Sequence, residues 1–422
     1  MIKRIGIIGL GTVGEATVRS LMKYSSVIAN RTSLKIEIKA LCDSKVKKRS
    51  LAARFRIPFT NDPSRLINDP DIDTIVELIG GINPAKQLIM DALRSGKNVV
   101  TANKALLAEC GKELFALAER KRKRIGFEAS ACGAIPLIES ISDGLVACQV
   151  QELYGILNGT TNYILYRMGK ERMSFIAALR EARARGFAER NPSLDIEGVD
   201  TVHKLCILSY LCFGIWPNPA KVHREGISNI SLLDIIYAEE LNYRIKLLAI
   251  AKRKGNSLDL RVHPTLVSMD HPISEVSYAY NAVSLDTEPA GKLLFYGLGA
   301  GGGPTSSSVI SDIVSISFYE RGFLRKEENI ILKNTRNISA RYYIRFMAKD
   351  KPGVLAQISK VLASCSISIA SVTQKAWVKG RFVPIVMITH EAKEDNMQRA
   401  FKRINELPAI KTHSQLIRIE NL

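Results

Sequence analysis

A carboxylate and an amine stand four residues apart near the middle of the chain, at Asp200 and Lys204. Apolar residues recur around Lys204, and this pattern predicts a helix over residues 200–213. Residues four apart share one helix face, so the two charges can act together. The loop that precedes them carries Glu189 and Asp195. A carboxylate beside an amine, preceded by a loop of acids, suits an amino-acid substrate and proton transfer to an oxygen.

The same spacing also has an ordinary structural explanation. An Asp and a Lys four apart on an exposed helix stabilise it by only ~0.2–0.5 kcal/mol, and such surface pairs are common. The pair alone therefore leaves two interpretations open, a proton-transfer site and a solvated surface pair, and other parts of the chain must decide between them.

The chain begins with a glycine-rich motif in the setting that dinucleotide-binding proteins use. Residues 4–10 form an apolar run that predicts a buried parallel strand, and residues 15–23 predict a helix. Glycines between them allow a tight turn and close approach of the backbone, so that a pyrophosphate can rest on the helix N-terminus. The sequence therefore predicts a Rossmann-type domain whose cofactor contacts include Gly9, Gly11, Thr12, Val13 and Gly14.

The residues after the second predicted strand (36–41) give conflicting signals about the cofactor. Asp43 can bind a ribose hydroxyl, which favours NAD. A cluster of bases can instead hold a 2′-phosphate, which favours NADP. The bases are Lys45, Lys47, Lys48 and Arg49. We predict NADP or NAD, with a slight preference for NADP.

Further candidate contacts follow two later strands, predicted over residues 72–79 and 98–101. Ligands of doubly wound sheets bind beyond the carboxyl ends of the strands, so Asn103 and Lys104 are candidates for contact with nicotinamide or substrate. The alternative for Lys104 is a solvated lysine at a helix start. A second glycine loop, residues 297–303, is either a linker or a further contact through Gly303.

The stretch from Glu128 to Pro136 combines one acid with small residues. Oxygen ligands from a carboxylate and from accessible backbone carbonyls suit a hard cation, here a monovalent one. The alternative is close backbone packing at a domain hinge. The residues themselves leave both interpretations open.

Composition narrows the class of protein. No stretch of 18 apolar residues is present, so no membrane span is predicted. Seven scattered cysteines without a Cys-x-x-Cys pair favour reduced thiols and a cytoplasmic location.

The formal net charge of +19 raises the possibility of nucleic-acid binding. No aromatic residues interleave the basic cluster at 120–124, so we predict no nucleic-acid partner and assign the charge to attraction of anionic nucleotides and substrates.

At 422 residues the chain predicts two or three domains of the α/β class. After the Rossmann domain, a mixed α/β substrate and dimerisation domain is expected, with helices near 174–185, 200–213 and 232–252 and strands near 259–268 and 276–285. A helix at 305–321 can pack back on the first domain. A ferredoxin-like βαββαβ unit follows over about 340–420. The predicted boundaries are 1–133, 134–322, a linker at 323–338, and 339–422.

Taken together, these motifs resemble those of homoserine dehydrogenases that carry a C-terminal ACT domain. The resemblance spans nearly the whole chain, and the turn at 350–355, with Pro352 expected in a first helical turn and Gly353 beside it, resembles the ACT signature. The matching stretches, in the family's order, are Gly9–Gly14, Val76–Gly81, Thr101–Leu107, Phe127–Pro136, Gly155–Tyr163, Gly186–Leu205 and Gly299–Asp312.

The resemblance implies NAD(P)-dependent interconversion of L-homoserine and L-aspartate 4-semialdehyde, in the biosynthesis of threonine, methionine and isoleucine. By position, Lys204 matches the family's catalytic proton donor and acceptor, and Lys104 its other active-site lysine. Asp195 and Asp200 match the substrate-site acids, and Glu189 matches the acid that holds the substrate's amino group.

The resemblance also implies ligands outside the reaction. Glu128 matches the side-chain ligand of the family's sodium site, with the carbonyls of Ala131, Gly133 and Ile135 as further ligands. Threonine is the expected effector at the ACT domain, and a homodimer or homotetramer is the expected assembly. Cys42 departs from the arginine that many members have there, and Asn191 stands where the loop often has Asp.

These residues predict a mechanism in which nicotinamide delivers hydride to the aldehyde carbon. Lys204 then gives a proton to the oxygen, Lys104 polarises that oxygen, and Asp200 tunes the pair. Two alternatives belong to other classes. A non-catalytic sensor would bind nucleotide and amino acid without hydride transfer, and a nucleic-acid-binding protein would show steeply salt-dependent affinity.

Overall fold

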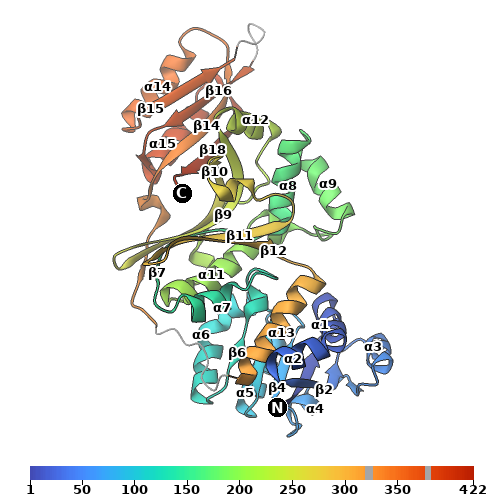
Figure 1. Cartoon of the computed structure of the whole chain (residues 1–422). Helices are drawn as coiled ribbons and strands as arrows, with labels where there is room; N and C mark the ends of the chain where they lie inside the picture. Colours follow the sequence, from blue (N-terminus) through green and yellow to red (C-terminus); the bar gives the residue numbers. More distant parts are fainter. Residues whose placement is uncertain (319–326, 376–381) are drawn as a thin grey trace. The chain divides into compact units, whose positions relative to one another are not determined.

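The structure is a computed structural model that describes residues 1–318, 327–375 and 382–422 (Figure 1). The chain divides into two compact units, each assembled from three segments. The predicted boundary at 322 and the start of the predicted linker at 323–338 lie outside the described residues, so the four-part division remains a prediction. The first unit contains Met1–Leu153, Asp200–Val222 and Asn281–Ile330, and the second contains Tyr154–Val199, His223–Tyr280 and Ile331–Leu422.

The first unit is built on a six-stranded sheet in the order β3-β2-β1-β4-β5-β6. Every neighbouring pair in it is parallel. This is the strand order of the Rossmann fold, and the apolar runs form its strands because both faces of such a sheet are covered. The predicted fold class is confirmed. The strands are β1 (Ile2–Ile8), β2 (Lys35–Cys42), β3 (Phe59–Thr60), β4 (Thr74–Glu77), β5 (Asn98–Thr101) and β6 (Ile125–Gly126).

Helix α13 (Gly302–Phe318) returns to this sheet from late in the sequence and lies beside α1 (Thr12–Lys23) (Figure 1). Its Val309, Ile313 and Ile316 join the apolar cluster around β1. The helix predicted at 305–321 therefore begins slightly earlier, and its predicted end lies outside the described residues. The unit's other helices include α2 (Ser25–Thr32), α3 (Arg49–Arg54), α4 (Ser64–Ile67), α5 (Ala85–Arg94), α6 (Lys104–Arg120), α7 (Leu137–Glu139) and α11 (Val199–Phe213).

The second unit contains a long antiparallel pair, β9 (Tyr243–Lys254) and β10 (Ser257–Ser268). The helix predicted over 232–252 is wrong in its second half. Helix α12 (Leu232–Glu240) ends where Asn242 takes a positive φ of 62°, and the apolar run that follows pairs with β10. Short apolar runs do not distinguish a buried strand from a helix, and long-range pairing decided this one.

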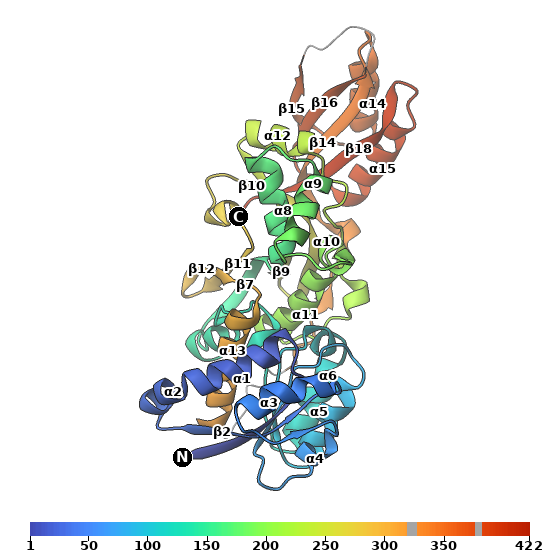
Figure 2. The ribbon, with the colours of Figure 1, turned by 90° about the vertical axis from the view of Figure 1, so that its right-hand side faces the viewer.

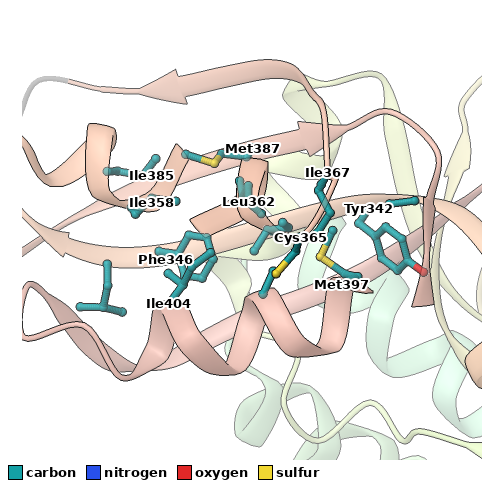
Figure 3. Packing of buried hydrophobic residues seen from close by; sticks show 14 of the residues in the cluster. Tyr342, Phe346, Ile358, Leu362, Cys365, Ile367, Ile385, Met387, Met397 and Ile404 are labelled. Atoms are coloured by element: carbon teal, nitrogen blue, oxygen red, sulfur yellow. The ribbon is translucent and has the colours of Figure 1, made fainter. Parts of the chain in front are cut away.

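The C-terminal part of the second unit has the predicted βαββαβ order, and its strands lie in the order β18-β14-β16-β15. Two helices cover one face, where an apolar cluster with Phe346, Ile358, Met387 and Ile404 forms the core (Figure 3). Pro352 is not in the first helical turn as predicted, because Gly353 caps the helix with a φ of 86°. The elements are β14 (Ser339–Lys349), α14 (Val354–Ser364), β15 (Ile369–Gln374), β16 (Phe382–Thr389), β17 (Ala392–Lys393), α15 (Glu394–Asn405) and β18 (Ile410–Glu420).

The C-terminal strand also belongs to the sheet that precedes it in the chain. Strand β18 pairs antiparallel with β14 on one side and parallel with β10 on the other, so the ferredoxin-like part and the β9–β10 pair form one sheet in the second unit (Figure 2).

Within the described residues, every helix is too short or too polar to cross a membrane. The remaining elements are α8 (Gly159–Lys170), α9 (Phe175–Ala184), α10 (Ser193–Ile196), β7 (Gln149–Ile156), β8 (His223–Arg224), β11 (Tyr280–Glu288), β12 (Gly291–Leu298) and β13 (Ile331–Leu332).

Candidate active site

One carboxylate is shared by two amines in the first unit. Asp200 Oδ1 lies 2.6 Å from Lys104 Nζ, and Asp200 Oδ2 lies 3.0 Å from Lys204 Nζ. The side chains of Asp200 and Lys204 are each only 7% exposed, whereas that of Lys104 is 44% exposed. The alternative of a solvated surface pair is therefore wrong for Asp200 and Lys204. The cluster holds two cations against one anion, which leaves positive charge for an electronegative oxygen.

Helix α11 fixes the buried members of this cluster. It is apolar on all sides and almost entirely buried, from Asp200 to Phe213. A buried ammonium is costly unless it is paired, so the carboxylate one turn earlier on the same face stabilises Lys204 in place. Asp200 and Lys204, four residues apart, therefore form a fixed ion pair inside the protein.

Lys104 is positioned by polar residues at the ends of two neighbouring strands. It is the first residue of α6, and Asn103 caps that helix by accepting from the amide of Leu106 at 3.2 Å. The Asn103 side chain also donates to the carbonyl of Gly81 at 2.5 Å. The backbone N–H of Asn103 donates to Thr101 Oγ1 at 3.0 Å. Lys104 therefore stands at a helix start whose backbone is held by these bonds, and its partly exposed amine pairs with Asp200.

Glu77 anchors this arrangement, and the sequence reasoning missed it. It lies fully buried at the end of β4 and accepts from Thr101 Oγ1 at 2.7 Å and from the amide of Ile79 at 2.7 Å. These bonds tie the carboxyl ends of β4 and β5 together below Lys104. The signal was present as a single acid inside an otherwise apolar strand.

The other predicted substrate residues, Glu189 and Asp195, belong to the second unit. Glu189 is exposed. Asp195 lies on α10, a single helical turn within the segment predicted as a loop, and accepts from Asn158 Nδ2 at 2.7 Å. Asn158 caps α8 by accepting from the amide of Thr161. The acid-rich loop is thus anchored to a helix start.

The first glycine motif lines a cavity of about 520 Å³ together with residues that follow β2 and β4. Gly9 has a φ of 97°, and a Cβ there would lie 2.6 Å from the backbone of Leu78. A Cβ at Gly14 would lie 2.0 Å from the carbonyl oxygen of Gly9. Gly11 has open space around it and caps α1, whose first residues are Thr12 and Val13. Gly9 and Gly14 therefore build the turn, and Gly11 leaves room for a ligand.

The cavity wall after β2 carries the residues that gave the conflicting cofactor signals. Both oxygens of Asp43 bind backbone amides, Oδ2 that of Leu10 at 2.7 Å and Oδ1 that of Lys45 at 2.8 Å. Ser44, Lys45 and Lys48 line the same cavity. Asp43 thus holds the glycine turn in place, and Lys45 and Lys48 are the charged side chains that line the cavity.

The second glycine loop leads into α13 close to the start of α1. A Cβ at Gly302 would lie 3.3 Å from the carbonyl of Thr12, and Ser306 lies 3.1 Å from Ser20 through their hydroxyls. Gly303 has open space around it. The loop is therefore not a simple linker, because it places Gly303 at a helix start beside the cofactor motif.

The predicted cation site is a tightly packed turn. Glu128 is buried and accepts from the amides of Ile138 at 2.9 Å and Glu139 at 2.8 Å. Burial raises its pKa to about 7 against the opposing effect of these bonds. Asp312, missed by the sequence reasoning, binds the amide of Glu128, and burial raises its pKa well above the usual range.

The backbone carbonyls of this turn have partners but keep acceptor capacity. The carbonyl of Gly133 accepts from Ser308 and that of Ile135 accepts from the amide of Leu137, and each oxygen has a second lone pair. Gly133 has a φ of 60°, and a Cβ there would lie 2.5 Å from the backbone of Gly299. Close backbone packing is therefore present, and the Glu128 carboxylate and nearby carbonyls are of the oxygen-donor type that suits a hard cation.

Comparison with known proteins decides the family. Models of the homoserine dehydrogenase NAD-binding domain, of homoserine dehydrogenase itself and of the ACT domain match residues 9–128, 136–314 and 342–409. A homoserine dehydrogenase of Helicobacter pylori is 40% identical over 420 residues, which cover 99% of each chain. The chain belongs to the homoserine dehydrogenase family.

Solved structures agree with this family. A homoserine dehydrogenase from Thiobacillus denitrificans is similar with a TM-score of 0.93 and 39% identity, over 100% of this chain and 99% of that one. A hyperthermophilic archaeal homoserine dehydrogenase in complex with NADPH is similar with a TM-score of 0.64 and 26% identity, over 75% of this chain and 98% of that one.

Family membership settles the reaction class. This homoserine dehydrogenase is an NAD(P)-dependent oxidoreductase of amino-acid biosynthesis that interconverts L-homoserine and L-aspartate 4-semialdehyde, and it carries an ACT domain. The alternatives of a non-catalytic sensor and of a nucleic-acid-binding protein are not favoured by any of these relatives.

Proposed function

We propose that Lys204, Asp200 and Lys104 carry the proton transfer of this dehydrogenase. In the reducing direction, bound nicotinamide supplies hydride to the aldehyde carbon. Lys204 gives a proton to the oxygen, Lys104 polarises that oxygen, and Asp200 holds both amines. The observation that carries this proposal is the single buried carboxylate shared by two amines, since positioned acid–base groups typically contribute ~10²–10⁴-fold to a rate.

The loop acids supply recognition of the amino-acid part of the substrate. Glu189 is exposed and carries negative charge, and Asp195 is oriented by Asn158. Both suit the substrate's ammonium group. We assign them to binding of the substrate and not to proton transfer.

NADP is the preferred cofactor in this proposal. Both Asp43 oxygens bind backbone amides, and these bonds reduce the repulsion that the carboxylate would exert on a 2′-phosphate. Lys45 and Lys48 line the same cavity and can bind that phosphate. The archaeal relative with NADPH is consistent with this preference. Gly9, Gly11, Thr12, Val13, Gly14, Asn103, Lys104 and Gly303 are the proposed contacts of the cofactor.

Sodium is the proposed occupant of the Glu128 turn. Its ligands are the Glu128 carboxylate and the carbonyls of Ala131, Gly133 and Ile135. The support is a buried acid whose pKa burial raises to about 7, because a cation beside it would favour the charged form.

Threonine is the proposed effector of the ACT domain, and a homodimer or homotetramer is the proposed assembly. Strand β12 exposes Leu294, Tyr296 and Leu298 on one face, an apolar row that suits contact with a second copy. We assign the enzyme to the cytoplasm. The absence of any disulfide bond in the described residues supports this location.

A spectrophotometric assay with aspartate semialdehyde, run in parallel with NADPH and NADH, tests the proposed site and cofactor. We expect oxidation of both cofactors with a lower KM for NADPH, and loss of turnover in Lys204→Ala with cofactor binding retained. Near wild-type turnover in that variant would overturn the role of Lys204. A lower KM for NADH would overturn the cofactor preference and leave the rest intact.

A further inference from the structure

A cavity of about 770 Å³ opens within the second unit, and its lining includes none of Lys104, Asp200 and Lys204. One part of its wall comes from residues 174–176 and 225–232, which precede the ACT region. The other part comes from β14, α15 and β18 of the ACT region. The elements can be followed in Figure 2. Its size is within the range of small-molecule sites, and both parts of the unit contribute side chains.

One wall of the cavity carries hydrogen-bond donors. Arg345 is 6% exposed, and its Nε and Nη2 bind Asp234 at 2.6 and 3.0 Å, so these bonds use only two of its three guanidinium nitrogens. Helices α9 and α12 both begin at this cavity, capped by Ser174 and Ser231, which line it. Helix N-termini favour anions. Asp234 already balances the charge of Arg345, so the guanidinium contributes a directed hydrogen bond through Nη1 and not surplus charge.

The cavity also holds one carboxylate. Glu225 Oε1 binds His223 Nε2 and Arg418 Nη1, each at 2.9 Å, and the side chain is 37% exposed. Burial opposes its ionisation, but His223 and Arg418 outweigh burial and hold its pKa at about 2. The group is therefore anionic at neutral pH. Its second oxygen is not used in these two contacts and can accept from an ammonium group.

The rest of the wall mixes amides and hydroxyls with apolar side chains. Asn229, Gln398 and Gln415 provide hydrogen bonds, and Phe401 and Leu416 provide apolar contact. With one acid and one base on the wall, the cavity suits neither a nucleotide, which requires surplus positive charge, nor a metal ion, which requires several acids. A small molecule that carries both a carboxylate and an ammonium satisfies every part of it.

We propose that this cavity is an amino-acid effector site, with the ligand's carboxylate at Arg345 and the starts of α9 and α12 and its ammonium at Glu225. The proposal rests on the proposed amino-acid regulation of this enzyme and locates it. It places the ligand between β14, α15 and β18 of the ACT region and the segments at 174–176 and 225–232, and not at the Gly353 turn of the ACT signature.

The cavity is connected to the strands that join the two parts of the unit. Arg418, which holds Glu225, also binds Glu394 at 2.6 Å, and it lies on β18 opposite Thr265 of β10. Glu225 follows β8, which pairs with β10 as well. An ammonium that binds the second oxygen of Glu225 places a further cation on the carboxylate that Arg418 contacts. Ligand binding therefore changes the ion pairs at the seam between β10 and β18.

Calorimetric titration of the full chain with L-threonine, L-methionine and L-isoleucine tests this site. Glu225→Gln removes the proposed ammonium partner, and Asn229→Trp fills the cavity from an exposed position whose replacement does not disturb the core. Glu240→Gln is the matched control, because Glu240 also pairs an ACT residue, Lys375 at 2.6 Å, but lies outside the cavity. Asp350→Asn probes the turn instead.

We expect at least one of the three amino acids to bind, Glu225→Gln to weaken its binding by about tenfold or more, and Asn229→Trp to abolish it. Glu240→Gln and Asp350→Asn should bind as the wild type does. The methyl ester and the N-acetyl form of the bound amino acid should both fail to bind, because each lacks one of the two charges.

The outcomes separate the two proposals. If threonine does not bind but methionine or isoleucine binds with this pattern, the threonine assignment is wrong and the cavity site stands. If threonine binding is lost in Asp350→Asn and kept in Glu225→Gln and Asn229→Trp, the cavity site is wrong and threonine regulation stands. If none of the three binds the wild type, both are wrong.

Discussion

The two units contain buried charge clusters of opposite design. In the first unit, one carboxylate, Asp200, serves two amines, those of Lys104 and Lys204. In the second unit, each arginine of the seam serves two carboxylates. Arg418 binds Glu394 at 2.6 Å and Glu225 at 2.9 Å, and Arg261 binds Asp259 and Glu420.

This difference distinguishes a charge cluster that can act on a substrate from one that holds strands together. In the cluster at Asp200 one carboxylate contacts two amines, and the amine of Lys104 belongs to a side chain that is 44% exposed, so a substrate oxygen can reach it. The arginines of the seam are at most 3% exposed and their donors are used by two acids each, so they hold strands together. Burial and stoichiometry, and not charge alone, distinguish the two.

The largest expected effect is on folding, at the seam. Arg418→Met should lower the free energy of unfolding of the second unit by about 3–5 kcal/mol, because it leaves the buried carboxylate of Glu394 and the partly exposed one of Glu225 without their cation. Urea titration measures it. The exposed pair Arg172–Glu239 gives the control, since Arg172→Met should cost about 1 kcal/mol or less. Equal losses in both variants would show that the seam does not stabilise the unit.

The next effect is on catalysis, at the shared carboxylate. Asp200→Asn should lower kcat by about 10²-fold, because the two amines lose the group that positions them, and misplacement by about 1 Å can cost that much. NADPH affinity should remain unchanged. Asp91→Asn removes a comparable carboxylate from an exposed pair with Arg94 and should leave kcat unaltered. A kcat near wild type for Asp200→Asn would make this cluster architectural as well.

A smaller effect concerns Glu128, whose pKa is raised from 4.5 when unfolded to about 7 when folded. Protonation of this group therefore stabilises the fold fully below pH about 4.5, and that stabilisation is lost as the pH rises through about 7. At about pH 8, sodium at ten times its Kd should restore about 1.4 kcal/mol.

Thermal unfolding in sodium chloride and in choline chloride of equal ionic strength measures this effect. We expect a Tm higher by roughly 2–4 °C in sodium at about pH 8, and no difference near pH 5, where the acid is protonated. Glu128→Gln should abolish the difference at both pH values. A sodium effect that persists in Glu128→Gln would place the cation elsewhere.

The smallest effect is on cofactor choice. Lys45→Ser should raise the KM for NADPH by about threefold to fivefold and leave the KM for NADH nearly unchanged, because an exposed charge contributes only about 1 kcal/mol. Parallel steady-state assays measure both values. Lys47→Ser, an exposed neighbour outside the cavity, serves as the control. Equal changes for the two cofactors would argue that Lys45 does not face the 2′-phosphate.

Local patterns made much of this protein predictable. The strand, glycine motif and helix at the start of the chain, and the Asp200–Lys204 spacing, are contained within a few residues each, and both formed as expected. The βαββαβ order of the ACT region followed from alternating runs in the same way.

The features that were missed depend on contacts between distant residues. Glu77 meets Thr101 across neighbouring strands, and Asp312 meets Glu128 across 184 positions of sequence. The run at 243–252 was predicted as helix because its apolar residues fit either structure, and only pairing with β10 made it a strand. Sequence spacing carries no information about such partners.

Single-turnover oxidation of NADPH by aspartate semialdehyde, in the wild type and in Lys204→Met, tests the central claim most directly. It observes the chemical step without product release. We predict that Lys204→Met slows this step by ~10²–10⁴-fold while NADPH binds with unchanged affinity. A single-turnover rate near that of the wild type would show that the proton reaches the oxygen by another route, and that the buried pair at Asp200 and Lys204 is structural.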